Sequence, residues 1–223
     1  YNTLVNNDVY EPAQRLVLPN VTSADSTYGE RYPYTPFPLE NDDATAKDYL
    51  AKAMGELGVS NAADIKLELL TTDTEGAKKQ AEVLQEQFQK NLGITVEIKQ
   101  VTYKQRLEME QTKEYDMVVT GWVPDYSDAY SYLELWISDG QYNHSGYNNP
   151  RYDELLEASQ FETDAAKRQD MLFEAEQIFL GEDSALVPLQ LRRDQYLVNP
   201  KLENFNVYFV GYDFNLVYAD LAE

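Results

Sequence analysis

The sequence predicts an α/β protein, a sandwich of helices around a mixed sheet, and three observations support this. Apolar and polar residues alternate at residues 65–69 and 94–98, a pattern typical of strands. Between these runs, apolar residues recur at helical spacing before Gly93; they are Ala77, Ala81, Leu84, Phe88 and Leu92. Strand, helix and strand in this order predict a βαβ unit. At 223 residues the chain is also long enough to build one substantial core.

The first part of the chain, residues 1–43, has no sustained apolar period and is rich in proline and tyrosine. We expect this segment to drape over a core that is formed elsewhere. The pattern changes after Asp43. Residues 44–57 are helical in character, with Asp42 or Asp43 as the N-cap and Gly58 as the C-terminal stop.

Further helices and strands follow the βαβ unit. The pattern predicts helices at residues 104–112, 129–137, 150–160 and 164–180, a buried strand at 115–123, and paired strands at 185–191 and 195–198. Pro150 suits the first position of its helix, where its missing N–H has no cost.

Charge and composition exclude several classes of function. The formal net charge of -21 repels phosphate backbones and anionic lipid, which argues against nucleic-acid binding. The chain has no cysteine, so it has no disulfides and no thiolate sites. No apolar run reaches the length of a membrane span, and the chain does not open with a basic segment followed by an apolar one. Because it begins at Tyr1 without a methionine, we expect a processed chain or a fragment.

The usual signatures of enzymes are missing from the sequence. It has no nucleophile elbow, no glycine-rich phosphate loop and no zinc-protease motif. The single histidine, His144, lies in a loop and is expected to be solvated. Asp125 and Asp128 are chemically suited to acid–base work or Ca²⁺ binding, but no calcium-loop pattern surrounds them. We therefore expect a protein that is not an enzyme and has no cofactor and no metal.

The most informative segment is residues 115–128, where an apolar run ends in Gly121, Trp122 and Val123 before Pro124 breaks it. A residue without a side chain, a large aromatic ring and then Asp125 suit an extended ligand with a cationic end. Asp125 also has a structural interpretation, as a cap for a helix that begins near residue 127.

The same segment contains aromatic residues with two interpretations. Trp122 and Tyr126 flank the expected strand end, and either a ligand wall or core packing accounts for them. Tyr132, Leu133 and Trp136 recur at helical spacing and are expected in the core.

Several segments, in order and at matching spacing, resemble the peptide-binding class of bacterial extracellular solute-binding proteins, which serve oligopeptide, dipeptide and nickel ABC importers. The matching segments are residues 46–58, 81–98, 115–128 and 146–153, then Arg168, Leu172, Ala175 and Glu176, and finally residues 185–189.

The resemblance implies that the chain is the C-terminal lobe of a receptor about twice its size, with half of a binding cleft. It implies an entry segment at residues 1–43, the α/β lobe of the type II peptide-binding class at 44–198, and a return segment toward the missing N-terminal lobe at 199–223. The backbone at Gly121 and Val123 would pair with the peptide, Trp122 and Tyr126 would line the cleft, and Asp125 would bind the α-ammonium.

The implied partners are a peptide, the N-terminal lobe and a membrane permease, with no nucleic acid. The implied location is extracytoplasmic, as a cell-surface lipoprotein or a periplasmic protein. Two alternatives stay open. The first is a receptor of the same fold for another solute, such as an oligosaccharide, a nickel chelate or haem; the second is a hydrolase that uses a carboxylate.

Overall fold

The computed structural model describes residues 10–192, 194–208, 210 and 214–222. The first nine residues of the expected entry segment therefore lie outside the described part, as do positions 209, 211–213 and 223 of the expected return segment. The chain divides into two compact units. Unit 1 contains Pro38–Thr120 and His144–Gly146, and unit 2 contains Val9–Phe37, Gly121–Asn143 and Tyr147–Glu223.

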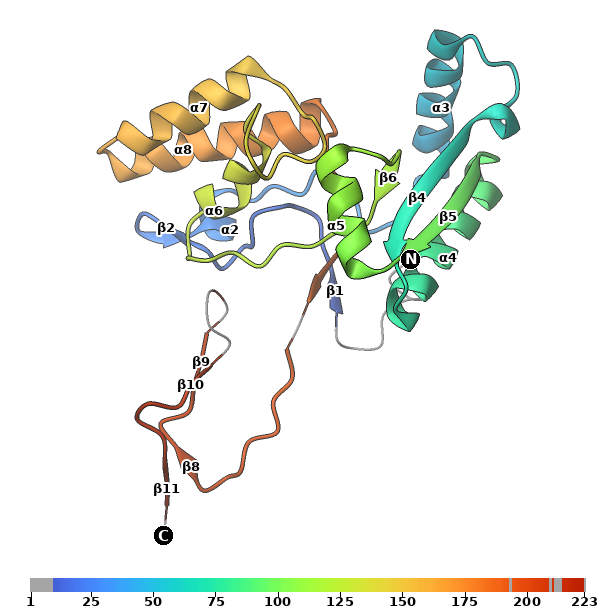
Figure 1. Cartoon of the computed structure of the whole chain (residues 1–223). Helices are drawn as coiled ribbons and strands as arrows, with labels where there is room; N and C mark the ends of the chain where they lie inside the picture. The colour runs from blue at the N-terminus through green and yellow to red at the C-terminus, as the bar shows by residue number, and fades with distance from the viewer. Residues whose placement is uncertain (1–9, 193, 209, 211–213, 223) are drawn as a thin grey trace. The chain divides into compact units, whose positions relative to one another are not determined.

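Unit 1 is built around the predicted βαβ motif, which is confirmed (Figure 1). Its elements are α3 (Asp43–Leu57), the 3-10 turn η1 (Ala62–Asp64), β4 (Lys66–Thr72), α4 (Glu75–Leu92), β5 (Thr95–Val101), α5 (Tyr103–Thr112) and β6 (Met117–Val118). The sheet has the order β5-β4-β6, and both pairings are parallel, so this sheet is parallel and not mixed as the sequence predicts. In this register Leu69 lies opposite Ile98 on one side and Met117 on the other.

Local sequence accounts for the boundaries of α4. The Thr74 side chain accepts a hydrogen bond from the N–H of Ala77 and begins the helix. Gly93 ends it with a φ of 74°, a conformation that favours glycine. One face of the helix then buries Ala81 against Leu69 and Val96, which form the core of this unit.

The predicted strand at residues 115–123 is mostly wrong, because only Met117 and Val118 pair with β4. Beyond Val118 the chain leaves the ladder, and the Thr120 hydroxyl accepts a hydrogen bond of 3.1 Å from the Arg106 guanidinium on α5. A contact with a helix thus replaces strand pairing at this point.

Helices α7 (Pro150–Phe161) and α8 (Ala165–Glu176) are the longest elements of unit 2. Its elements are β1 (Tyr10–Pro12), β2 (Thr22–Ser23), β3 (Ser26–Thr27), α2 (Tyr28–Arg31), α6 (Tyr130–Leu133), the 3-10 turn η2 (Glu134–Trp136), α7 (Pro150–Phe161), α8 (Ala165–Glu176), the π-helical turn η3 (Gln177–Glu182), β7 (Gln190–Arg192), β8 (Leu202–Glu203), β9 (Asn206–Val207), β10 (Phe214–Asn215) and β11 (Asp220–Leu221). Helices α7 and α8 lie side by side (Figure 1). Pro150 occupies the first turn of α7, as predicted.

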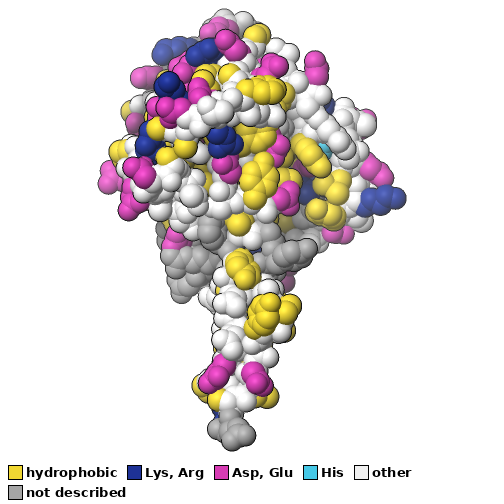
Figure 2. Space-filling model, turned by 90° about the vertical axis from the view of Figure 1, so that its left-hand side faces the viewer, with side chains coloured by type: hydrophobic (Ala, Val, Ile, Leu, Met, Phe, Trp, Pro, Cys, Tyr) yellow, Lys and Arg dark blue, Asp and Glu magenta, His cyan; other side chains and the backbone are white. Residues whose placement is uncertain are grey.

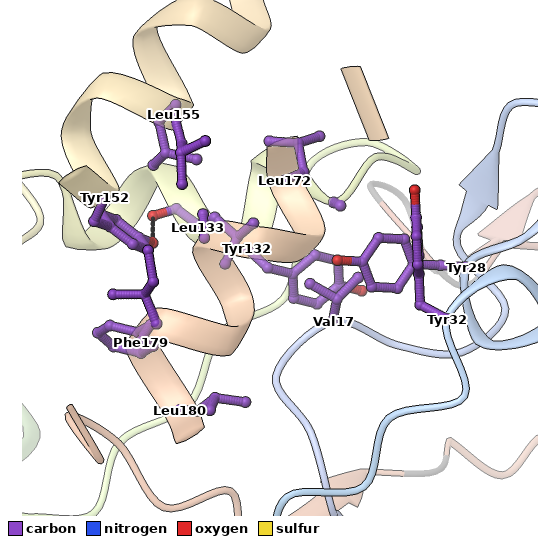
Figure 3. Close-up of a cluster of buried hydrophobic side chains, with 14 of the residues drawn as sticks. Val17, Tyr28, Tyr32, Tyr132, Leu133, Tyr152, Leu155, Leu172, Phe179 and Leu180 are labelled. Carbon is purple, nitrogen blue, oxygen red and sulfur yellow. Dashed lines mark hydrogen bonds between the residues drawn. The ribbon is translucent and has the colours of Figure 1, made fainter. Parts of the chain in front are cut away.

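The core of unit 2 joins these helices to the entry segment (Figure 3). Tyr132 and Leu133 are buried there, and Trp136 packs against them, which confirms the core prediction for these residues. The Tyr152 hydroxyl donates a 2.6 Å hydrogen bond to the Leu133 carbonyl inside the cluster. The ring of Tyr152 is therefore buried among apolar side chains, and its hydroxyl has a hydrogen-bond partner.

The entry segment contributes to this core, so the expectation that it only drapes over a core is wrong. Its members in the cluster are Val17, Val21, Tyr28 and Tyr32. The Tyr32 ring stacks on Phe173 of α8 with a centroid distance of 4.3 Å. Aromatic and β-branched residues supply enough apolar surface to build a core without regular periodicity.

The predicted strand pair near residues 185–198 is also wrong. Residues 190–192 form β7, which pairs with β1 in antiparallel register, Glu11 opposite Leu191. Residues 195–198 form no strand. Residues 190–192 thus pair with a strand that is far away in sequence instead of with residues 195–198. Local alternation of apolar and polar residues carries no information about such a distant partner.

The C-terminal part of unit 2 consists of two antiparallel strand pairs, β9 with β10 and β8 with β11. Tyr196, Phe205 and Phe214 form a row of rings with centroid distances of 6.1 and 5.9 Å. Figure 2 shows hydrophobic side chains exposed along the segment that carries β8 to β11. The exposed residues include Val207, Leu216, Val217, Tyr218 and Leu221.

Candidate functional site

The predicted site lies in unit 2, on the segment that we call the lip, residues 121–126. The lip contains neither helix nor strand. Pro124 is buried, while Gly121, Val123 and Asp125 are exposed. The proline thus holds the segment against unit 2, and the backbone on both sides of it stays accessible.

Trp122 is oriented by a hydrogen bond and remains partly accessible. Its indole N–H donates to the carbonyl of Ser131 over 2.9 Å, which fixes the plane of the ring. The ring lies 5.9 Å from that of Tyr142, tilted by 53°, and 41% of the residue is exposed. Tyr142 was not predicted as a site residue, because no local pattern brings it to Trp122.

Asp125 is exposed, and its carboxylate makes no hydrogen bond or ion pair within the described residues. The interpretation of Asp125 as a helix cap is wrong. Helix α6 begins at Tyr130, and the N–H of Tyr130 donates instead to Asp128, over 2.8 Å. The fold therefore leaves Asp125 with its full capacity to accept hydrogen bonds.

Tyr126 belongs partly to the scaffold. Its hydroxyl donates to the carboxylate of Glu134 over 3.2 Å. Partial burial, and then the negative charge of Glu134, raise the pKa of Tyr126 well above its usual value. The hydroxyl consequently stays protonated and keeps donating to Glu134. The residue is still 44% exposed.

Asp128 is committed to an ion pair with Arg168 of α8. Two guanidinium nitrogens donate to its two carboxylate oxygens over 2.7 and 3.0 Å. This hydrogen bonding raises the pKa of Arg168. A carboxylate already engaged in this way is a poor candidate for acid–base work or for Ca²⁺.

His144 lies in unit 1, where its Nδ1 is 3.9 Å from a carboxylate oxygen of Glu110. Glu110 is buried and forms an ion pair with Arg106. His144 is only partly exposed, so the expectation that it is solvated is only partly correct. Within the described part of the chain, no group of three or more His, Cys, Asp or Glu side chains is placed to hold a metal ion.

Among the residues that the structure describes, the lip thus combines backbone groups without a hydrogen-bond partner, an oriented indole ring and a carboxylate without a partner. Such an arrangement is suited to bind an extended, polar molecule with a cationic group at one end.

The chain matches the model for "Bacterial extracellular solute-binding proteins, family 5 Middle" over residues 1–144. The chain belongs to this family. Its members are solute-binding proteins and are extracellular, as the family description states.

Two relatives show how this chain is related to longer proteins. The oligopeptide-binding protein OppA of Bacillus subtilis is 34% identical over 166 residues, which is 74% of this chain and 30% of that protein. The dipeptide-binding protein of Lactococcus lactis is 30% identical over 178 residues, or 78% of this chain and 32% of that protein. The chain thus spans about a third of the length of these relatives.

Solved structures confirm the predicted fold class. An oligopeptide ABC transporter substrate-binding domain from Bacillus anthracis superposes with a TM-score of 0.82 at 29% identity, over 100% of this chain and 43% of that one. OppA of Listeria monocytogenes bound to peptide gives 0.79 at 32% identity, over 100% and 42%. The fold is therefore that of a lobe of the peptide-binding solute receptors.

The helices of the described residues are all too short or too polar to cross a membrane.

Proposed function

We propose that this chain is the C-terminal lobe of the peptide receptor of an ABC importer, and that Asp125 binds the α-ammonium of an extended peptide. The observation that carries the proposal is the exposed Asp125 carboxylate, which has no partner within the described residues. An ammonium group supplies the charge and the donors that this carboxylate lacks.

The neighbouring residues have matching roles. The backbone at Gly121 and Val123 pairs with the peptide main chain, which gives an affinity that tolerates many sequences. Trp122 and Tyr126, which are 41% and 44% exposed, line the cleft. The family membership and the peptide-bound Listeria structure support the same ligand class.

The partners of the lobe follow from the same proposal. Residues 1–43 enter the lobe and add residues such as Val17 and Tyr28 to its core, residues 44–198 form the rest of it, and residues 199–223 return to an N-terminal lobe of the same receptor. The exposed apolar residues of β8 to β11 support this return, because several large apolar side chains exposed on one short segment favour burial against another part of the protein. The receptor works outside the cytoplasm and delivers peptide to a membrane permease, without an enzymatic step.

The test compares free and N-acetylated peptides of the same sequence on the full-length receptor, with and without Asp125→Ala. Acetylation removes the positive charge, and we expect it to weaken binding to the wild type strongly. Asp125→Ala should weaken binding of the free peptide by about 2–5 kcal/mol, because it removes one partner of a desolvated charge pair. Titration calorimetry that gives equal affinities for the free and acetylated peptides contradicts the role of Asp125.

A receptor of the same fold for an oligosaccharide is the second candidate. The oriented Trp122 ring beside the exposed Tyr142 ring favours it, because sugar rings stack on exposed aromatic faces. Binding of an oligosaccharide to the full-length receptor that Asp125→Ala leaves unchanged, but that Trp122→Ala abolishes, selects this alternative.

A further inference from the structure

The residues that directly follow Asp125 are tied to different parts of unit 2. The Tyr126 hydroxyl donates to Glu134 of η2 over 3.2 Å. The Ser127 hydroxyl accepts from the backbone N–H of Thr22 in β2 over 3.2 Å. Neither tie involves the side chain of Asp125 itself.

The third residue after Asp125, Asp128, is held by two hydrogen bonds from one arginine. Arg168 of α8 donates to both oxygens of Asp128, and its Nε donates to the carbonyl of Ser159 at the end of α7 over 3.2 Å. Asp128 also accepts from the N–H of Tyr130. The side chains of Arg168 and Asp128 are only 25% and 22% exposed, so solvent competes little with this bidentate pair. One arginine therefore connects α7, α8 and the start of α6 to the chain three residues beyond Asp125.

We propose that Arg168 is a positioning residue for ligand binding: through Asp128 it holds the lip so that the free Asp125 carboxylate is preorganised for an ammonium ion. This inference rests on the proposed function. The contrast in contacts supports it, because Asp125 lacks a partner among the residues that the structure describes, while each of the next three residues is bonded to another element. A site held in place by its neighbours loses less conformational entropy when the ligand binds, and its charged group is already oriented toward the ligand.

Arg168 also controls the local charge. By pairing with Asp128, it leaves Asp125 as the carboxylate of this turn that is available to a ligand cation. An unpaired Asp128 would offer a second, wrongly placed site for the ammonium group.

The test measures how well the full-length receptor distinguishes a free peptide from its N-acetylated form. In Arg168→Met the ratio of the two affinities should fall about tenfold, because the ammonium contact is no longer aligned. Arg168→Lys keeps the charge but not the two parallel bonds, and its ratio should lie between those of the wild type and Arg168→Met. Asp128→Asn keeps the volume of the side chain and its acceptor for Tyr130, so it tests the same ion pair if Arg168→Met folds poorly.

Arg151→Met is the matched control. Arg151 of α7 donates to Glu174 of α8 over 3.1 and 2.7 Å, and it makes no described contact with the lip. The Arg151→Met substitution removes an arginine–carboxylate pair between α7 and α8. The ratio of the affinities for the free and the acetylated peptide should nevertheless stay at the wild-type value. Far-ultraviolet circular dichroism and the thermal midpoint check that each variant is folded.

The outcomes separate this inference from the proposed function. If Asp125→Ala removes the discrimination while folded Arg168→Met and Asp128→Asn keep it, positioning by Arg168 is wrong and the proposed function stands. If Asp125→Ala also keeps the discrimination, the proposed function itself is wrong. A variant of Arg168 that weakens free and acetylated peptides equally has only a structural role, and this result also overturns the inference.

Discussion

At the scale of single residues, Asp125 and Asp128 show how the same side chain acquires different tasks three positions apart. Asp128 faces Arg168 and the N–H of Tyr130, and it stabilises the turn. Asp125 is exposed and has no partner within the described residues. The neighbours supplied by the fold, and not the residue type, separate the structural carboxylate from the one available to a ligand.

Gly121 is not required by the fold of this chain. It does not have a positive φ, and a Cβ atom added to it would meet no heavy atom within 4 Å. The space that the missing side chain leaves is therefore open to a ligand backbone.

Gly121→Val should weaken the binding of peptides with unrelated sequences to a similar degree, because the added side chain blocks the approach of the peptide main chain. The thermal midpoint should change little. Calorimetry with several peptides on the full-length receptor measures the effect, and Gly76→Val on α4, another position with open space around it, is the control. A variant that loses only some peptides would indicate a side-chain pocket instead of backbone pairing.

At the scale of elements, a buried ion pair attaches the entry segment to α8. Glu176, which is 0% exposed, accepts from the Arg15 guanidinium over 2.5 Å. The same carboxylate accepts from the backbone N–H groups of Leu16 and Val17 over 3.2 and 3.0 Å. These bonds hold an irregular segment in the core, where its backbone would otherwise lack hydrogen-bond partners.

Arg15→Met should lower the free energy of unfolding by about 3–5 kcal/mol, because it leaves the Glu176 charge buried without its partner. Arg15→Met combined with Glu176→Gln should recover part of this loss, since glutamine is neutral and still accepts from Leu16 and Val17. Urea denaturation at neutral pH measures both variants. A double variant as unstable as Arg15→Met alone would show that the uncompensated charge is not the cause.

At the scale of the whole molecule, the chain spans about a third of the length of its relatives, 30% of OppA from Bacillus subtilis. It supplies the lip, where the Asp125 carboxylate has no partner within the described part of the chain. In the proposed receptor, a second lobe covers this surface and removes water from it. The contact between Asp125 and an ammonium ion is much stronger in a closed, desolvated site than in water.

The isolated chain of 223 residues should fold cooperatively and yet show no peptide affinity at micromolar concentrations. Its lip remains in water, where a single charge-assisted hydrogen bond contributes little. Titration calorimetry with peptides that bind the full-length receptor is the measurement, and circular dichroism verifies folding. Binding at micromolar concentration or tighter would show that one lobe contains the complete site.

The sequence by itself determined the elements whose signals are local. Capping residues and apolar spacing predicted α3, α4, α5, α7 and α8, and alternation predicted the pair β4 and β5. These features depend on neighbours a few positions away, so periodicity and caps are sufficient to find them. The position of the lip was likewise marked by Gly121, Trp122 and Pro124.

Only the tertiary structure decided which distant residues meet. It gave Asp125 and Asp128 different roles, because it placed Arg168, forty positions after Asp128, against Asp128 and not against Asp125. It paired β7 with β1, ended β6 after Val118, and took core residues from an entry segment without periodicity. Charge pairs and strand partners of this kind arise when remote segments come together during packing, and a single sequence carries no local trace of them.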